Sequence, residues 1–133
     1  MGYLLKMYVI AFGVFFIIDM FWLGVIARSF YRNQLGSMMR TDINWMAAVS
    51  FYLLFIAGIL FFVLQPALAK DSLQYAVFVG AFFGLITYAT YDLTNLATLK
   101  NWPLTMTLVD LVWGSVLASS TAAVSFLIVK RLG

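Results

Sequence analysis

The sequence predicts an all-α integral membrane protein, a four-helix bundle in which antiparallel neighbours are joined by short loops. Hydrophobic residues make up 65% of the 133 residues and charged residues only 10%. A soluble domain of this size could not bury so much apolar surface. Four apolar runs, residues 3–27, 45–69, 74–97 and 104–129, are each long enough for the roughly 20 residues that cross a bilayer. We therefore expect a single transmembrane domain over residues 1–133.

The runs are continuous rather than alternating, which favours helices over the short strands of a membrane barrel. The segments between them are brief, and residues 28–44 are expected to form the one longer loop. Pro103 stands where proline favours the first turn of a helix, at the start of the fourth run. Short connections make consecutive helices antiparallel neighbours.

Charge leaves the membrane orientation open. Each side of the membrane carries four basic residues: Lys6, Lys70, Lys130 and Arg131 on one side, and Arg28, Arg32, Arg40 and Lys100 on the other. The positive-inside rule does not decide between equal counts, and copies inserted both ways round would also fit. We expect both termini in the cytoplasm, because the free amino terminus adds a charge on that side.

Cysteine and histidine are absent. Their absence excludes disulfides, thiolate chemistry and iron–sulfur ligation, and also His-ligated haem or metal sites. No cofactor and no metal site are predicted. The eight Lys and Arg residues are scattered, so no nucleic-acid binding is expected. The expected partners are membrane lipids, with a second copy of the chain or another membrane protein as further candidates.

Three carboxylates lie inside the predicted spans: Asp19, Asp92 and Asp110. An ionisable group at membrane depth is costly and suggests a functional site. Because helices one and three run opposite to helix four, all three should lie on one side, roughly 8–12 Å below a membrane face. That face carries the candidate charge partners Arg28, Arg32, Arg40 and Lys100. Either one aspartate keeps a proton, or these residues pair with the aspartates and merely lock the bundle.

Helical spacing groups further residues with the aspartates. Gly80 and Gly84 form a small-xxx-small pair that lets another helix approach closely, and Gly114 shares the stripe of Asp110. Asp-x-x-Trp occurs in helices one and four at matched depth, so Trp22 and Trp113 are expected to be pocket walls. The candidate polar pocket is formed by Asp19, Asp92, Asn95, Asp110, Tyr88 and Tyr91.

The stretch Tyr-Asp-Leu-Thr-Asn-Leu-Ala-Thr-Leu at residues 91–99, followed by Trp102-Pro103, resembles the signature of a known family. This is an uncharacterised family of small bacterial four-span membrane proteins, catalogued as a domain of unknown function. Asp19-x-x-Trp22 and Asp110-x-x-Trp113-Gly114 fit the same pattern, so the resemblance covers essentially the whole chain. It implies four helices and a bacterial inner membrane, without an activity. The association of such genes with lipid-modifying enzymes hints at a lipid ligand.

Three functions remain open. The favoured one is a site that binds or acts on a lipid or other amphipathic small molecule. An enzyme could use one protonated and one ionised carboxylate, or Mg²⁺ held by oxygens, but the signatures of known intramembrane aspartate enzymes are absent. The second is a proton-coupled transporter working as a dimer, like the small multidrug-resistance proteins, although its acids would lie off the midplane. The third is an accessory subunit of a membrane complex.

Overall fold

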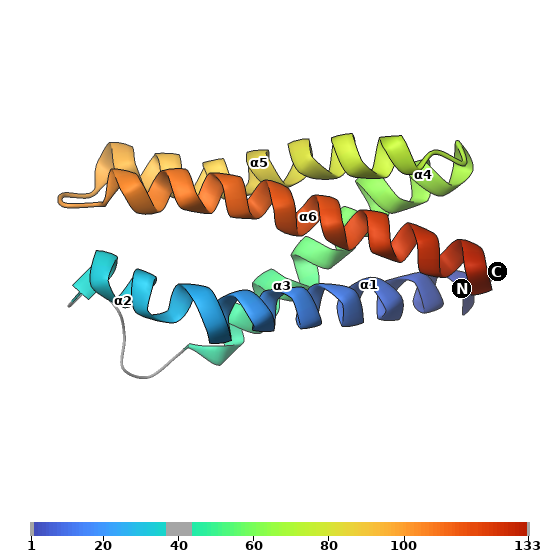
Figure 1. Cartoon of the computed structure of the whole chain (residues 1–133), viewed down its shortest axis with the longest axis horizontal. Helices are drawn as coiled ribbons and strands as arrows, with labels where there is room; N and C mark the ends of the chain where they lie inside the picture. The colour runs from blue at the N-terminus through green and yellow to red at the C-terminus, as the bar shows by residue number, and fades with distance from the viewer. Residues whose placement is uncertain (1, 37–43, 133) are drawn as a thin grey trace.

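The computed structural model describes residues 2–36 and 44–132, without the side chains of residues 25–28. Throughout this part of the chain the secondary structure is helical (Figure 1). The elements are α1 (Gly2–Phe21), the π-helical η1 (Trp22–Ala27), α2 (Arg28–Leu35), α3 (Trp45–Ile59), the π-helical η3 (Leu60–Leu64), α4 (Gln65–Ala69), α5 (Leu73–Thr98) and α6 (Leu104–Leu132).

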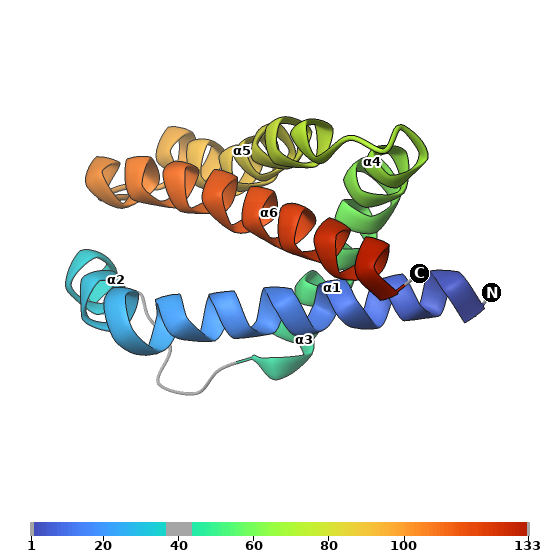
Figure 2. The same cartoon turned by 45° about the vertical axis from the view of Figure 1, so that its right-hand side comes forward.

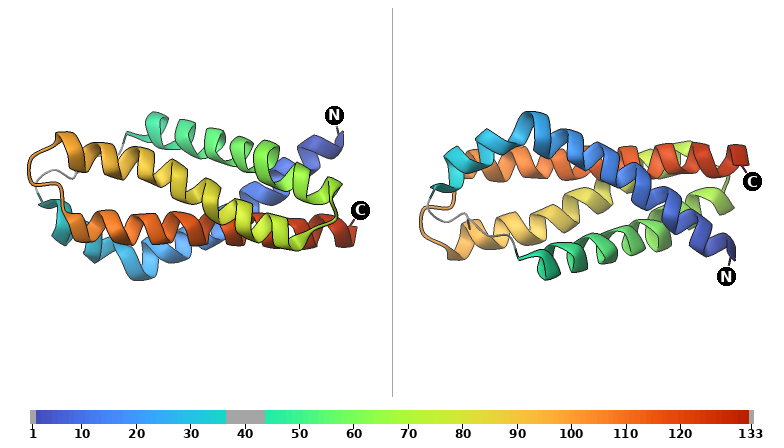
Figure 3. Two further views of the ribbon diagram at one scale, coloured as in Figure 1. Left: turned by 90° about the horizontal axis from the view of Figure 1, so that it is seen from above. Right: turned by 90° about the horizontal axis from the view of Figure 1, so that it is seen from below.

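Four helical segments are long and apolar enough to cross a membrane: Gly2–Gly24, Trp45–Ala69, Leu73–Thr98 and Leu104–Leu132. Both termini and the turn between α4 and α5 lie at one end of the bundle, whereas α2 and the turn between α5 and α6 lie at the other (Figure 3). The prediction of an all-α membrane bundle of four helices is confirmed.

The first span does not end in a loop. α1 continues through η1 into α2 as one helical path (Figure 2), so residues 28–35, which we expected within the loop, are helical. The loss of hydrophobicity marks where a chain leaves the hydrocarbon, but backbone hydrogen bonding need not stop there. Residues 37–43 of the expected loop lie outside the described residues. α3 then begins at a cap, where the Asn44 side chain accepts a hydrogen bond of 3.1 Å from the Ala47 amide.

The seam between α5 and α6 is closed by glycine. A Cβ at Gly84 would overlap the carbonyl oxygen of Gly114, and one at Gly80 would lie 3.0 Å from the Cα of Ser119. The Ser119 hydroxyl also donates a hydrogen bond of 2.8 Å to the Val77 carbonyl across the seam. Small residues at such a contact let two backbones meet, which is how helices associate in lipid.

The half of the bundle nearer the termini is filled with apolar side chains. Its fully buried members include Ile59, Val63, Leu64, Ala67, Ala76, Leu117 and Ala122. The Lys130 ammonium pairs with the Asp71 carboxylate at this end, between the tip of α6 and the α4–α5 turn. Further along, the Phe55 ring of α3 packs on Phe83 of α5 at a centroid distance of 5.6 Å. Thr121 and Ser125 of α6 are the polar side chains buried among these apolar ones in the described part of this half. The three buried or span-located aspartates lie toward the α2 end instead.

Candidate functional site

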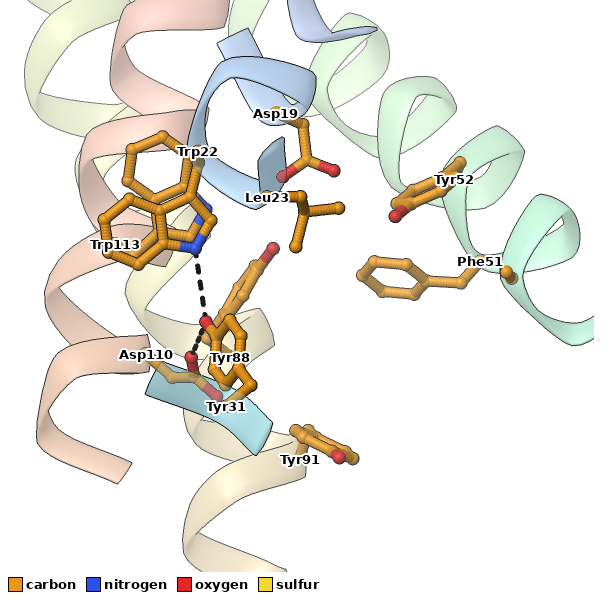
Figure 4. A pocket seen from close by; sticks show the side chains of 11 residues that line it. Asp19, Trp22, Leu23, Tyr31, Phe51, Tyr52, Tyr88, Tyr91, Asp110 and Trp113 are labelled. Atoms are coloured by element: carbon orange, nitrogen blue, oxygen red, sulfur yellow. Dashed lines mark hydrogen bonds between the residues drawn. The ribbon is translucent and has the colours of Figure 1, made fainter. Parts of the chain in front are cut away.

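A cavity of about 330 Å³ lies inside the α2 end of the bundle (Figure 4). All four spans and α2 contribute to its wall. It is lined by Asp19, Trp22, Leu23, Tyr31, Ala48, Phe51, Tyr52, Tyr88, Tyr91, Asp110 and Trp113. The structure thus brings together six of the residues that the sequence suggested and adds Tyr31 and Tyr52 as polar lining residues.

A tyrosine from α2 holds Asp110. The Tyr31 hydroxyl donates a hydrogen bond to Oδ1 of Asp110 and accepts one of 3.3 Å from Nε1–H of Trp22 (Figure 4). Asp110 is only 5% exposed, and a buried carboxyl needs such partners. Burial and the adjacent Asp110 raise the pKa of Tyr31 above that of an exposed tyrosine. The hydroxyl therefore remains a donor at neutral pH.

The two Asp-x-x-Trp segments meet across α1 and α6. The Trp22 and Trp113 rings are stacked, with centroids 4.3 Å apart and planes 10° from parallel. The stack forms one wall of the cavity, and its other side faces an apolar groove lined mainly by α6, including Leu108 and Val112. Trp22 therefore has two roles, because it packs on Trp113 and also orients Tyr31.

Asp19 lies across the cavity from Asp110. Its polar neighbours are the side chains of Tyr52 and Trp113, and Figure 4 shows the Tyr52 hydroxyl turned toward the Asp19 carboxyl. Asp19 is 5% exposed. Tyr52 was missed because the second run carries no charge, although its distance from the start of that run places it at the depth of Asp110. Tyr31 was missed because its segment was expected to be loop.

Asp92 and Asn95 do not line the cavity. Asp92 is wholly buried beside the Asp110 carboxyl, and neither of its oxygens has a hydrogen-bond partner among the described residues. Asn95 is half-buried, and its backbone carbonyl accepts a hydrogen bond of 2.9 Å from the Leu99 amide. Within the described part of the chain, no group of three His, Cys, Asp or Glu residues is arranged to hold a metal ion.

The structure describes only part of the group of basic residues that the sequence suggested as charge partners. The side chains of Arg32 and Lys100 are exposed. Among the side chains that the structure describes, neither forms an ion pair with Asp19, Asp92 or Asp110. The Arg28 side chain and the whole of Arg40 lie outside the described residues. Pairing of the aspartates with Arg28 or Arg40 therefore stays a prediction.

An apolar cleft adjoins the cavity. It has a volume of about 390 Å³, lies between α3 and α5, and is lined by Phe51, Thr87, Tyr88 and Tyr91. Phe51, Tyr88 and Tyr91 also line the cavity, so the two spaces share a wall. Phe51 and Tyr91 are 44% and 56% exposed on the surface that a bilayer would cover. The polar cavity thus borders an apolar opening between two of the candidate membrane spans.

Four apolar helices around a carboxylate-bearing cavity define a small multi-pass membrane protein. The chain belongs to the DUF2177 family of predicted membrane proteins, whose family model matches residues 4–127. This match confirms the family membership that the resemblance implied, and the family has no assigned activity to transfer. Neither the curated proteins nor the solved structures contain a match to this chain.

Proposed function

We propose that the protein binds the polar end of a lipid or another amphipathic small molecule in the cavity at the α2 end, and holds or acts on it near one membrane face. The supporting observation is that a polar space and an apolar space adjoin. Asp19, Asp110, Tyr31 and Tyr52 bring polar groups to the cavity. The neighbouring cleft presents Phe51, Thr87, Tyr88 and Tyr91.

An amphipathic ligand needs both environments at once. Its polar group loses water on entering the bilayer and must find hydrogen-bonding or charged partners. Its apolar part gains nothing from a polar wall and stays in contact with hydrocarbon. Because the two spaces share Phe51, Tyr88 and Tyr91, a ligand with its polar end among the carboxyls can extend toward the lipid between α3 and α5.

The filling of the opposite half favours binding at one face over transport through the bundle. Ile59, Val63 and Leu117 are wholly buried there. A passage through the bundle would have to displace this packing, and closely packed interiors resist such displacement. The proton-coupled transporter suggested by the sequence therefore ranks second, and the accessory subunit third.

The test fills the cavity without changing its charges. Ala48 lines the cavity, whereas its neighbour Ala47 is exposed on the same helix. Ala48→Phe should reduce the amount of lipid or added amphipath that remains with the purified protein. Ala47→Phe introduces the same ring outside the cavity and should leave this amount unchanged. Mass spectrometry of the extracted ligands gives the measurement, and equal retention by both variants and the wild type would rule the proposal out.

A further inference from the structure

We propose that the ligand group in this cavity is a cation, specifically an amine or quaternary ammonium group carried by an amphipathic molecule. This inference rests on the proposed function and narrows it to one class of polar group. It is drawn from the composition of the cavity wall.

The wall combines aromatic rings with carboxyls. Seven of the lining residues are aromatic: Trp22, Tyr31, Phe51, Tyr52, Tyr88, Tyr91 and Trp113. The charged or chargeable groups beside them are Asp19 and Asp110, and none of the described lining residues is Lys or Arg. Aromatic faces attract cations through their quadrupoles, most strongly where water is excluded, and ringed cages of this kind recognise quaternary ammonium groups.

Two carboxyls lining the same cavity also disfavour anionic headgroups. Asp19 and Asp110 are each 5% exposed, and two negative charges in such a space repel one another unless a positive charge or a proton is present. A phosphate or sulfate would add to that repulsion, and anion sites are normally built from Arg, Lys or clustered backbone amides. An ammonium group would be attracted to both carboxyls.

Asp19 is the better placed of the two for direct contact with the cation. Asp110 already accepts a hydrogen bond from Tyr31, and that tyrosine is held in turn by Trp22. Asp19 faces Tyr52 across the open part of the cavity (Figure 4). A compact metal ion is a poorer match, because the described residues offer no group of three acidic, His or Cys ligands and Mg²⁺ requires an octahedral set of oxygens.

The experiment compares headgroups on one hydrocarbon chain. The full-length protein is placed in nanodiscs of phosphatidylglycerol, which contains no amine. Dodecyltrimethylammonium, dodecyl sulfate and dodecanol are added below their micellar concentrations. Binding is followed by the tryptophan fluorescence of the protein, to which Trp22 and Trp113 of the cavity wall contribute together with Trp45 and Trp102 elsewhere. Empty nanodiscs are the partitioning control.

The ammonium probe should bind at least about tenfold more tightly than the neutral or anionic probe. Asp19→Asn should weaken that preference, because the variant keeps the shape of the side chain and removes one of the two carboxyl charges. Asp71→Asn, at the exposed turn on the opposite end, should leave the preference intact. If Asp19→Asn does not fold, the wild-type comparison alone still decides the question.

Other outcomes separate this inference from the function on which it rests. Equal binding of dodecanol and the ammonium probe, or tighter binding of the sulfate, would overturn the cationic headgroup and leave an amphipath site standing. Absence of binding by all three probes would overturn both. Competition by phosphatidylethanolamine in the nanodisc would identify a membrane lipid as the source of the amine. Cation binding without such competition would identify a lipophilic cation from outside the membrane.

Discussion

Helix α5 takes part in two seams that differ in construction. Toward α6 it presents Gly80 and Gly84, and the backbones meet with no room for a Cβ. Toward α3, in the half that contains α2, it presents Tyr88 and Tyr91, and the large rings frame a cleft of about 390 Å³. Small residues bring helices together in lipid, whereas large side chains hold them apart. One helix therefore supplies both the close packing and the opening of the bundle.

Gly84→Ala is the largest expected perturbation of the closed seam. The new methyl group would overlap the Gly114 carbonyl, and backbone cannot yield as a flexible side chain does. We expect a loss of about 3 kcal/mol or more of unfolding free energy, at the upper end for overpacked sites. Gly13→Ala is the matched control, because no atom lies within 4 Å of the added carbon. Thermal unfolding in detergent measures both, and similar melting temperatures would show that the seam is not closed by backbone contact.

Tyr31→Phe should act on the attachment of α2 to the bundle and leave the glycine contact between α5 and α6 unchanged. It removes the hydroxyl that bonds to Asp110 and Trp22, which we expect to cost about 1.5–3 kcal/mol, typical of a hydrogen bond to a charged group. Hydrogen exchange should become faster in α2 and stay unchanged along α6. Tyr3→Phe, an exposed tyrosine at the opposite end, serves as control. Exchange that accelerates equally in α6 would mean that the two seams are not independent.

Alkaline pH should weaken the attachment of α2 to the bundle, as Tyr31→Phe does. The pKa of Tyr31 is raised in the folded protein, so its stabilising contribution is complete below the usual tyrosine pKa of about 10. That contribution falls as the pH rises further, because the folded state holds the proton more tightly than the unfolded state. The protection of the α2 amides, which is the exchange rate relative to the base-catalysed rate of an unfolded chain, should therefore fall above this pH in the wild type and stay constant in Tyr31→Phe. A pH-independent difference between the two would contradict this.

Asp92→Asn tests the boundary between the seams. Asp92 is buried beside Asp110 with no described hydrogen-bond partner, and an amide in its place can donate to the Asp110 carboxyl. We expect a gain of about 1 kcal/mol in unfolding free energy, the usual net value of one hydrogen bond. Chemical denaturation gives the measurement. A large loss would instead indicate that Asp92 pairs with a basic residue such as Arg28.

Lys130→Ala should have the smallest effect. Its ion pair with Asp71 is exposed, the two side chains being 46% and 68% accessible. Exposed pairs contribute less than about 1 kcal/mol and are screened by salt. The melting temperature should fall slightly at low salt and not at all at high salt. A larger fall would show that the half of the bundle nearer the termini depends on this surface ion pair rather than on its buried apolar side chains.

The four spans were accessible from the sequence because they depend on hydrophobic length. The prediction that the aspartates lie toward one end of the bundle followed from helix direction. Gly80 and Gly84 were recognisable for a similar reason, since a spacing of four places them on one helix face. The position of Tyr31 was not accessible. It lies beyond the apolar run, where hydrophobicity no longer reports on secondary structure, and its partner Asp110 is far away in sequence. Tyr52 could have been found by counting depth along the second helix.

The π-helical turn η1 has a consequence for insertions and deletions. Along a regular α-helix, residues nine apart, such as Trp22 and Tyr31, point in opposite directions at about 100° per residue. Here they are hydrogen-bonded, with η1 occupying Trp22–Ala27. Adding or removing a single residue in this turn would rotate Tyr31 by about 100° and break that bond. Between Trp22 and Tyr31 the number of residues matters more than their side chains, so relatives that conserve these two residues should vary in residue type between them but not in residue number.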